Sequence, residues 1–596
     1  SALFPELKNG VADVVIDLKI TKNKNIILDI NTSLKSLDIS SLGLTLRGDV
    51  GIAGIFALNL TKTLQANYKF ELDLKGTTLS GVYLLNEISN LNGKIKITNN
   101  GVSCEYIWGE AYNTPIRFSG GINNFRALKL NGDMQIDLEL TNYKNFIPKD
   151  LKERFKDVDL QGPAEINVRF DDNLKDPQPP VIEGNIKLKE ASLKTTLLED
   201  KVRINSGNIA FKNNTFYLTG FALNYGAKDY VVDAKITDLI LPDIKMKLKT
   251  NELLLTSRFK IYDDHIHILR ASGTYLNSPF NIAGDIKDLK SLNNVTKGTL
   301  SLDLLDLRRI LPQISEPLTK FDIKGICNLD FSINGPLKQP KDLELIIEGQ
   351  SDRIGIWNFK IDEVKLNLKM KSNAILIPKF SAKPYGGTFI ATMEMDFAPQ
   401  NPPYSIRFSL QDLDLSKFVL DTDIKDKAIS GKGLIQTNIR GYGKNLETVK
   451  GEGTIVIKGS YLWEVPLLRG LANLLFLPNL SSIIFDEASC DFVIANKNIS
   501  TANLVLYSQN VNLFGEGSVN FDGTLNFLIT SSISEDFIKG TSEFAKVASS
   551  LLTQAGQLIG NIKISGTIKR PEYKFIPLPL DKILKDKLKI LLGGFF

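Results

Sequence analysis

The stretch RFKIYDDHIHILRASGTYLNSPFNIAGDIKDL, residues 258–289, decides how the rest of this chain is interpreted. Apolar and polar residues alternate in it with a period of two, which is typical of β-strands with one apolar face. The pair Asp263–Asp264 interrupts the alternation, and short polar pairs of this kind favour tight turns. The stretch is therefore predicted to form strands joined by polar turns.

The same pattern recurs in four other segments of equal length, which align with this one over 32 positions without gaps. They are residues 94–125, 208–239, 367–398 and 491–522. Positions two and four are apolar in every copy: Ile95 and Ile97, Ile209 and Phe211, Phe259 and Ile261, Leu368 and Met370, and Phe492 and Ile494. Position nine is apolar too: Val102, Phe216, Ile266, Ile375 and Ile499. Such a repeat predicts a stacked array of strands rather than separate globules.

Both histidines of the chain, His265 and His267, follow the Asp263–Asp264 turn. The equivalent positions of the other copies hold glycine, serine, threonine, tyrosine, alanine, leucine and asparagine, so the repeat does not require histidine. Two histidines with a distant third ligand form the weakest zinc pattern. We interpret the stretch as a polar turn and predict neither a metal nor a cofactor.

Catalytic motifs are not found in the sequence. With two histidines, no Ser-His-Asp or Cys-His arrangement has a base elsewhere in the chain, and GxSxG, HExxH and P-loop motifs do not occur. The carboxylates fall in turns or at alternating positions, as on a solvated face. The chain is not predicted to be an enzyme.

Composition and spacing argue against several further classes of protein. Lys+Arg exceeds Asp+Glu by only 72 to 67, so binding to nucleic acid is not implied. Cys104, Cys327 and Cys490 lie far apart without CxxC spacing and are predicted to be buried free thiols. No apolar run reaches the roughly 18 to 20 residues that span a bilayer.

Predicted helices are few. The phrases at 136–148, 301–312 and 409–420 each end a strand with an acidic residue and continue into a short amphipathic turn. Longer helices are predicted at 465–477, 535–560 and 580–592. All three lie in the last quarter of the chain, so they cannot shield the apolar faces of the preceding strands.

Two architectures satisfy these apolar faces: a closed sandwich or β-solenoid, or an open sheet whose apolar wall faces a ligand. We predict the second, a mainly β fold: an elongated, twisted, mostly antiparallel repeating β-groove with a few short helices near the C-terminus. The predicted wall comprises positions two and four of each repeat together with Ile455, Ile457, Leu525, Phe527 and Ile529. Lipid acyl chains suit such a wall, because each buried CH₂ contributes about 0.8 kcal/mol.

One region carries a resemblance to a known family. The phrase GEGTIVIKGSYLWEVPLLRGLANLLFLPNL (451–480) combines a G-x-G strand with a short helix after Val-Pro. After it comes a strand pair around a polar turn and the phrase GEGSVNFDG (515–523). These features resemble the C-terminal region of AsmA-like proteins, most clearly over residues 430–575.

The resemblance implies a bridge-like lipid transfer protein with a repeating β-groove. Such proteins are held in the inner membrane of a diderm bacterium by an N-terminal helix, absent from this chain, and reach across the periplasm towards the outer membrane. The implied partners are phospholipids, the inner and outer membranes and envelope membrane proteins at the two ends, and the implied role is outer-membrane biogenesis. No catalytic residues come with the family. On this interpretation, residues 1–430 form the groove body, 431–575 the AsmA-like region and 576–596 a C-terminal helix.

The C-terminal phrase LDKILKDKLKILLGGFF (580–596) predicts a basic amphipathic helix. Its apolar stripe comprises Leu580, Ile583, Leu584, Leu588 and Leu591, and the other side carries Lys582, Lys585 and Lys589. Such a helix either contacts an anionic membrane or a partner, or caps the end of the sheet.

The expected function is to bind lipid acyl chains in a long groove and conduct phospholipids between two membranes. Two alternatives remain open at this point: a scaffold for the assembly of outer-membrane proteins, and a closed β-solenoid that acts on envelope glycans.

Overall fold

The computed structural model describes most of the chain. The described residues are 6–22, 25–41, 44–60, 65–82, 85–153, 155–173, 175–176, 178–196, 198–289, 291–310, 322–465, 468, 471, 483–534 and 560–577. They form two units: the first contains residues 1–275 and 283–290, and the second contains residues 276–282 and 291–596. The predicted boundary at residue 430 lies inside the second unit, at the first residue of a strand that pairs with the strand before it.

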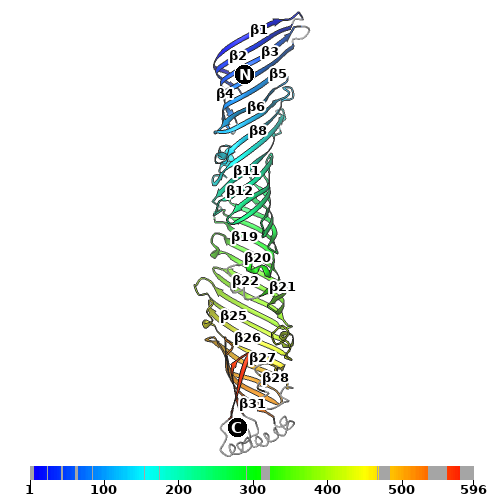
Figure 1. Cartoon of the computed structure of the whole chain (residues 1–596), viewed down its shortest axis with the longest axis vertical. Coiled ribbons are helices and arrows are strands. Elements are labelled where there is room, and N and C mark those ends of the chain that lie inside the picture. Colours follow the sequence, from blue (N-terminus) through cyan, green and yellow to red (C-terminus); the bar gives the residue numbers. More distant parts are fainter. Residues whose placement is uncertain are drawn as a thin grey trace, which may run out of the picture. The chain divides into compact units, whose positions relative to one another are not determined.

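The first unit is an antiparallel meander (Figure 1). Its strands are β1 (Glu6–Ile20), β2 (Asn25–Ser41), β3 (Leu44–Asn59), β4 (Gln65–Val82), β5 (Asn86–Thr98), β6 (Val102–Ala111), β7 (Thr114–Ile122), β8 (Lys129–Glu139), β9 (Val158–Gln161), β10 (Pro163–Asn173), β11 (Val181–Thr195), β12 (Val202–Lys212), β13 (Thr215–Tyr225), β14 (Lys228–Thr237), β15 (Asp243–Lys249), β16 (Leu253–Ile261) and β17 (His265–Tyr275). Each strand pairs with the next, except that β10 pairs with both β8 and β11, and the short β9 pairs with the far end of β11. Strand β18 (Ser278–Lys287) contains residues of both units.

The second unit is also an antiparallel meander. Its strands are β19 (Asn293–Asp303), β20 (Ile323–Pro336), β21 (Glu344–Ile356), β22 (Phe359–Lys371), β23 (Ala374–Pro384), β24 (Thr388–Asp396), β25 (Pro403–Asp414), β26 (Ser430–Tyr442), β27 (Lys450–Tyr461), β28 (Phe485–Ala495), β29 (Asn498–Tyr507), β30 (Val511–Asn520), β31 (Leu525–Ile533), β32 (Gly560–Thr567) and β33 (Arg570–Pro577). Because a meander returns to the same edge after every second strand, the long connections that follow β25 and β27 lie along one edge.

The repeat seen in the sequence corresponds to a β-hairpin in every copy. Position four pairs directly with position nine across the turn, as in Ile97 with Val102 and Phe211 with Phe216. The other three copies have the same register. In the fourth copy, the turn residues Ser372 and Asn373 have φ of 51° and 65°, positive values that match the twist of a two-residue hairpin. The predicted pairing of alternating strands is confirmed.

Short helices follow the acidic strand ends. The helical segments are η1 (Leu140–Asn145), α1 (Lys149–Lys152), η2 (Leu304–Asp306), α2 (Leu307–Ile310), η3 (Pro340–Asp342), α4 (Leu415–Val419) and η4 (Leu446–Thr448). The carboxylates of Asp303 and Asp414 cap the turns that follow them by accepting bonds from the backbone N–H groups of Leu305 and Ser416. The segments η1, η2, α2 and α4 lie within the amphipathic turns predicted at 136–148, 301–312 and 409–420, whereas the carboxylate of Glu139, before η1, makes no capping hydrogen bond.

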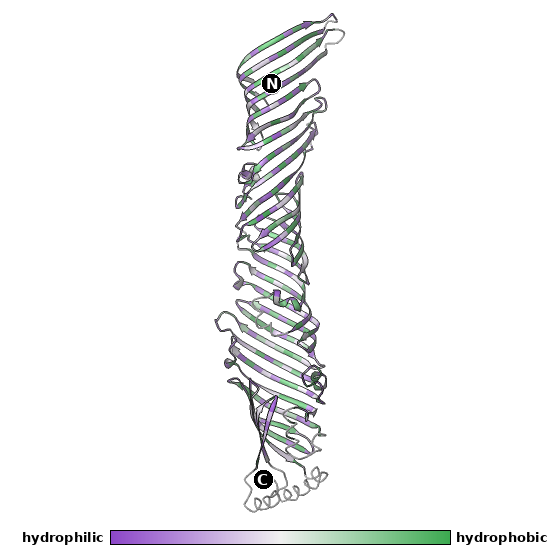
Figure 2. Cartoon of the chain, in the orientation of Figure 1, coloured by the Kyte–Doolittle hydropathy of each residue, from purple (hydrophilic) through white to green (hydrophobic). Residues whose placement is uncertain are grey.

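The strands of each unit form one open layer. In the described part of the chain, extensive contacts between strands follow the hydrogen-bonded ladders. Apolar and polar residues alternate along the strands (Figure 2), so each layer has one apolar and one polar face. The predicted open, mainly β sheet is confirmed, and the alternative of a closed β-solenoid is wrong.

Candidate functional site

Directly opposed apolar side chains cross the first unit in two parallel rows. The first apolar row comprises Ile116, Ile136, Ile166, Ile186, Ile209, Leu218, Ala234 and Met246. The second apolar row comprises Phe118, Met134, Val168, Gly184, Phe211, Phe216, Ile236, Ile244, Phe259 and Ile268. Opposed residues in a ladder have Cβ atoms about 5 Å apart, so each row is a continuous apolar stripe across the strands.

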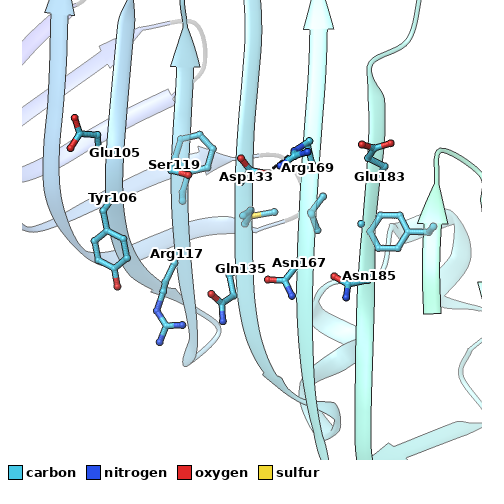
Figure 3. Close-up of a pocket in the computed structure, with 15 residues that line it drawn as sticks. Glu105, Tyr106, Arg117, Ser119, Asp133, Gln135, Asn167, Arg169, Glu183 and Asn185 are labelled. Carbon is cyan, nitrogen blue, oxygen red and sulfur yellow. Dashed lines mark hydrogen bonds and ion pairs between the residues drawn. The ribbon is translucent and has the colours of Figure 1, made fainter. Parts of the chain in front are cut away.

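The second apolar row is half-buried throughout and lines a hollow of about 590 Å³. Five members of the row, from Phe118 to Phe211, contribute to the lining. Figure 3 shows the polar residues on either side of them along the strands, with Ser119, Asp133, Arg169 and Glu183 in one line and Arg117, Gln135, Asn167 and Asn185 in another. These eight polar residues have the opposite side-chain parity to the apolar row, so the hollow lies between two rows of polar side chains, over the backbone of that row.

A further hollow of about 810 Å³ lies over the end of the first apolar row, between rows of polar side chains that include Lys235, Lys245 and Lys247. Leu218, Ala234 and Met246 belong to its lining, together with Ser257, which is opposite Met246 on the next strand. The Ser257 hydroxyl is buried and has no hydrogen-bond partner among the described residues.

The second unit has an equivalent third apolar row. It comprises Leu300, Leu329, Gly349, Leu366, Phe380, Ala391, Phe408, Thr437, Gly453 and Phe492. Ala391, Phe408, Thr437 and Gly453 line a hollow of about 510 Å³. The same geometry thus occurs in both units.

Aromatic rings fill the gaps that glycines leave in these rows. A Cβ atom at Gly184 would lie 2.7 Å from Cζ of Phe211, and one at Gly453 would lie 2.5 Å from Cζ of Phe492. A larger residue at either glycine would displace the ring. Sequence reasoning missed the contact between each glycine and its phenylalanine. For Gly453 and Phe492, the G-x-G strand and the phenylalanine at position two of the repeat were visible signals.

Every predicted wall residue lies on the apolar face. Ile95, Leu368 and Ile457 lie directly opposite other apolar residues of that face, namely Leu72, Ile347 and Ala488. The remaining predicted wall residues have the same parity along their strands. The structure therefore places the predicted wall residues of each unit on the same face of its sheet.

Four predicted wall residues are covered by protein. Ile494 is 7% exposed, and Leu525, Phe527 and Ile529 are 4%, 8% and 2% exposed. The expectation that these four line an open wall is therefore wrong. Sequence periodicity identifies the apolar face of a strand, whereas the cover comes from residues distant along the chain.

The cover is provided by the connections at the edge of the second unit. Val419, Ile429, Leu462, Trp463, Leu468 and Leu471 belong to one buried cluster with residues of β28, β31 and β32. Phe485, Ile562 and Ile564 in this cluster have no exposed surface. The predicted helix at 465–477 is described at residues 468 and 471, both helical, and Leu471 is completely buried. The apolar face is closed at this end of the second unit.

A smaller cover lies on the first unit. Leu140 and Tyr143 of η1 are buried in a cluster with Ala111, Ala164 and Ala191. The Tyr143 hydroxyl donates a 2.6 Å hydrogen bond to the carbonyl oxygen of Val158, and burial raises its pKa. Small alanine side chains leave room for the η1 segment to pack on the sheet.

The histidines contact separate carboxylates. Nδ1 of His265 lies 2.7 Å from Asp264 Oδ1, and Nδ1 of His267 lies 2.7 Å from Asp285 Oδ1. The His265 ring also stacks on Tyr262 at 4.4 Å. In the described ranges, no group of three or more histidine, cysteine, aspartate or glutamate residues is arranged to hold a metal ion.

The cysteines are free thiols whose pKa values are raised by burial. Cys104 and Cys327 are buried as predicted, whereas Cys490 is half-buried.

No model of a protein family matches the chain, and neither does any curated protein sequence. The structure defines the class of the protein: an open antiparallel β-sheet protein with a largely uncovered apolar face. Within the described part of the chain, no helix is both long and apolar enough to cross a bilayer. The predicted helices at 535–560 and 580–592, including the site residues Leu580 to Leu591, lie outside the described residues.

Proposed function

We propose that the apolar face binds lipid acyl chains and that the protein conducts phospholipids between two membranes. The observation that carries this proposal is the second apolar row, in which ten directly opposed residues remain half-buried, with no covering layer among the described residues. An uncovered stripe of this length is unusual in a protein that binds nothing, because exposed contiguous apolar surface is costly.

The dimensions of the row favour acyl chains over small ligands. Ten strands spaced about 4.8 Å apart give a stripe of about 43 Å. The hydrocarbon core of a bilayer, which holds two acyl chains end to end, is about 30 Å thick. A complete acyl chain therefore fits along the row, and each CH₂ that it buries contributes about 0.8 kcal/mol.

The composition of the face favours broad lipid selectivity. Its rows consist mainly of aliphatic and aromatic residues, and the charged residues of β8, β10 and β11 have the opposite side-chain parity. Such a wall holds the tails and leaves the headgroups in water. Transfer between an inner and an outer membrane, with the chain in the periplasm, rests on the resemblance of residues 430–575 to AsmA-like proteins.

Lipid extraction and mass spectrometry of protein purified without detergent tests the proposal. We expect co-purified phospholipid at one or more molecules per chain. The double variant Ile261→Asp with Leu368→Asp places charge on the apolar face of each unit and should lose most of this lipid. The control variant Thr256→Asp with Thr392→Asp changes charge on the polar face of each unit and should retain it.

Folding of both variants is checked by circular dichroism, and transfer is measured with fluorescent phospholipid between donor and acceptor vesicles. Unchanged lipid loading and transfer in a folded Ile261→Asp, Leu368→Asp variant would overturn the proposal. Wild-type protein that carries no lipid and transfers none would overturn it as well.

A further inference from the structure

The hollow of about 590 Å³ on the polar face of the first unit lies between two lines of polar side chains (Figure 3). The charged line comprises Ser119, Asp133, Arg169 and Glu183, and the amide line comprises Arg117, Gln135, Asn167 and Asn185. Within each line, the residues lie directly opposite one another on β7, β8, β10 and β11. The volume is in the range of sites that bind small ligands.

Every charged side chain in the lining of this hollow belongs to an ion pair. The pairs are Glu105 with Lys96 at 2.6 Å, Arg117 with Asp137 at 3.2 Å, Arg169 with Asp133 at 2.9 Å and Glu183 with Lys212 at 3.4 Å. A phosphate or carboxylate ligand would have to compete with the charges already paired there. The lining therefore favours a ligand that is polar and uncharged.

Two carboxylates orient the amide line. Gln135 Nε2 donates a 3.3 Å hydrogen bond to Asp137 Oδ1, and Asn167 Nδ2 donates a 2.9 Å hydrogen bond to Glu165 Oε1. The bond from Asn167, followed by the charge of Lys187, lowers the pKa of Glu165, so this carboxylate is ionised at neutral pH and can only accept.

This orientation leaves the carbonyl oxygens of the amides available to a ligand. Asp137 and Glu165 lie two residues from Gln135 and Asn167 along their strands, on the side away from the charged line. Because the amide nitrogens face these carboxylates, the amide oxygens face the hollow. Hydroxyl groups are suitable partners, since they donate to an amide oxygen and also accept from an amide nitrogen.

Exposed aromatic side chains stand at one end of the amide line. Cys104 pairs with Gly120 and Ile107 pairs with Phe118, so β6 has one more residue than β7 over this interval. Such a β-bulge re-aims side chains. Here Glu105 and Tyr106 both line the hollow, and Tyr106 is 54% exposed.

Trp108 extends the amide line onto β6. It lies directly opposite Arg117 and is 41% exposed. The flat rings of tryptophan and tyrosine combine an apolar body with a polar edge, which suits the C–H face and the hydroxyl rim of a sugar ring. A sheet face that carries amides together with exposed aromatic rings therefore has the chemistry of a carbohydrate site.

We propose that this hollow binds an extended, uncharged oligosaccharide with β-1,4 linkages, which runs across the strands along the amide line. Strands lie about 4.8 Å apart, close to the advance per ring of such a glycan, so successive rings meet successive strands. The line crosses β6, β7, β8, β10 and β11 from Trp108 to Asn185. Equal spacing of similar groups suits a polymer of identical units and gives the surface of a folded protein no advantage.

The carbohydrate site is independent of the lipid-binding proposal, because its side chains have the opposite parity to the apolar rows. The Ile261→Asp, Leu368→Asp variant should therefore bind the oligosaccharide as the wild type does. Loss of the amides should in turn leave lipid loading unchanged.

Isothermal titration calorimetry of the full chain with cellopentaose, a β-1,4-linked pentaglucose, tests the proposal. We expect saturable binding that changes less than about twofold when the salt concentration is raised well above ~0.1 M, because no free charge is involved. The double variant Gln135→Thr with Asn167→Thr should weaken binding about tenfold or more, since it removes the amide oxygens from two strands. Tyr106→Thr should also weaken binding, whereas Tyr106→Phe keeps the ring and should stay within about twofold of the wild type.

Asn208→Thr is the matched control, because Asn208 is an exposed amide of β12 that does not line the hollow. Circular dichroism checks that all variants are folded. Failure of the wild type to bind cellopentaose, or equal binding by Asn167→Thr and Asn208→Thr, would overturn the carbohydrate site.

Maltopentaose, the α-1,4-linked isomer, tests the match between glycan and strands. It contains the same sugar but coils, so it should bind at least about tenfold more weakly than cellopentaose. Equal binding of the two would overturn the assignment to an extended β-linked glycan. Salt-sensitive binding of inorganic polyphosphate that is lost in Asn167→Thr would overturn the assignment to an uncharged ligand.

Discussion

The phenolic hydroxyl of Tyr385 donates a 2.9 Å hydrogen bond to Oδ2 of Asp421 and so joins the turn between β23 and β24 to the segment that follows α4. Lys360 Nζ lies 3.2 Å from the other carboxylate oxygen, and the ring of Phe418 packs edge-on against Tyr385 at 5.6 Å. These contacts fasten the connection after β25 to the edge of the second unit. That connection contributes Val419 and Ile429 to the cover of the apolar face.

The contact of Tyr385 with Asp421 should make this edge sensitive to alkaline pH. Burial, followed by the interaction with Asp421, raises the pKa of Tyr385 from 10.0 to about 12. Its stabilising contribution is complete below pH 10.0 and is lost as the pH rises through about 12. Tyr385→Phe should lower the free energy of unfolding by about 1 kcal/mol and remove this alkaline loss. Chemical denaturation at a series of pH values measures both effects. Tyr442→Phe, at an exposed position, is the control, and an unchanged alkaline profile in Tyr385→Phe would contradict the assignment.

The cap of α4 should be sensitive to acid. Hydrogen bonds from Ser416, followed by those from Lys432, lower the pKa of Asp414 from 3.8 to about 2. The stabilising contribution of its carboxylate is therefore complete above pH 3.8 and is lost as the pH falls through about 2. Asp414→Ala should cost about 1 kcal/mol, whereas Asp414→Asn retains a capping oxygen and should cost less. Acid unfolding followed by circular dichroism distinguishes the variants. A steeper acid loss in Asp414→Asn than in the wild type would be inconsistent with this role.

Truncation should cost more in the covered cluster of the second unit than at Ile209, a half-buried position of the first apolar row. Ile564 has no exposed surface, so Ile564→Ala should leave a cavity and lower the free energy of unfolding by about 3 kcal/mol. Ile209 is half-buried in the first apolar row, and Ile209→Ala should cost about 1 kcal/mol in lipid-free protein. Urea denaturation of delipidated protein compares the two. Equal losses would indicate that the first apolar row is covered in solution.

Lys235, Lys245, Arg258 and Arg270 lie directly opposite one another on β14 to β17 and are here called the cation row. Removing a charge from this row should affect stability in the opposite sense to removing one partner of an ion pair. Lys245→Thr removes a charge that lies between Lys235 and Arg258, so it should be neutral or stabilising by a few tenths of a kcal/mol at low salt. Arg169→Thr removes the partner of Asp133 and should destabilise by about 0.5 kcal/mol. Thermal unfolding at low and high salt measures both changes. A loss of stability in Lys245→Thr that persists at high salt would show that the cation row is not under mutual repulsion.

Period-two alternation was sufficient to predict strands joined by polar turns and the apolar face to which the predicted wall residues belong. Ile97 and Val102 illustrate the reason: residues four and nine of the repeat must pair when positions six and seven form the turn. The short turns after acidic strand ends were predictable for a similar reason, since Asp303 and Asp414 cap turns formed by the residues that directly follow them. Local chemistry determines all of these features.

The sequence by itself therefore determined that this protein is a stack of antiparallel strands with one apolar face, because side-chain parity is a property of each strand alone. Only the tertiary structure decided which part of that face is open and which is covered. Ile209 and Ile529 have the same local pattern, yet Ile529 is buried in a cluster with Leu462, Trp463 and Leu471 and Ile209 remains half-exposed. The ion pair of Arg169 with Asp133 was also decided by the tertiary structure, because β8 and β10 pair across the intervening η1, α1 and β9 segments. Cover and this pairing arise from contacts between residues distant along the chain, which no local pattern specifies.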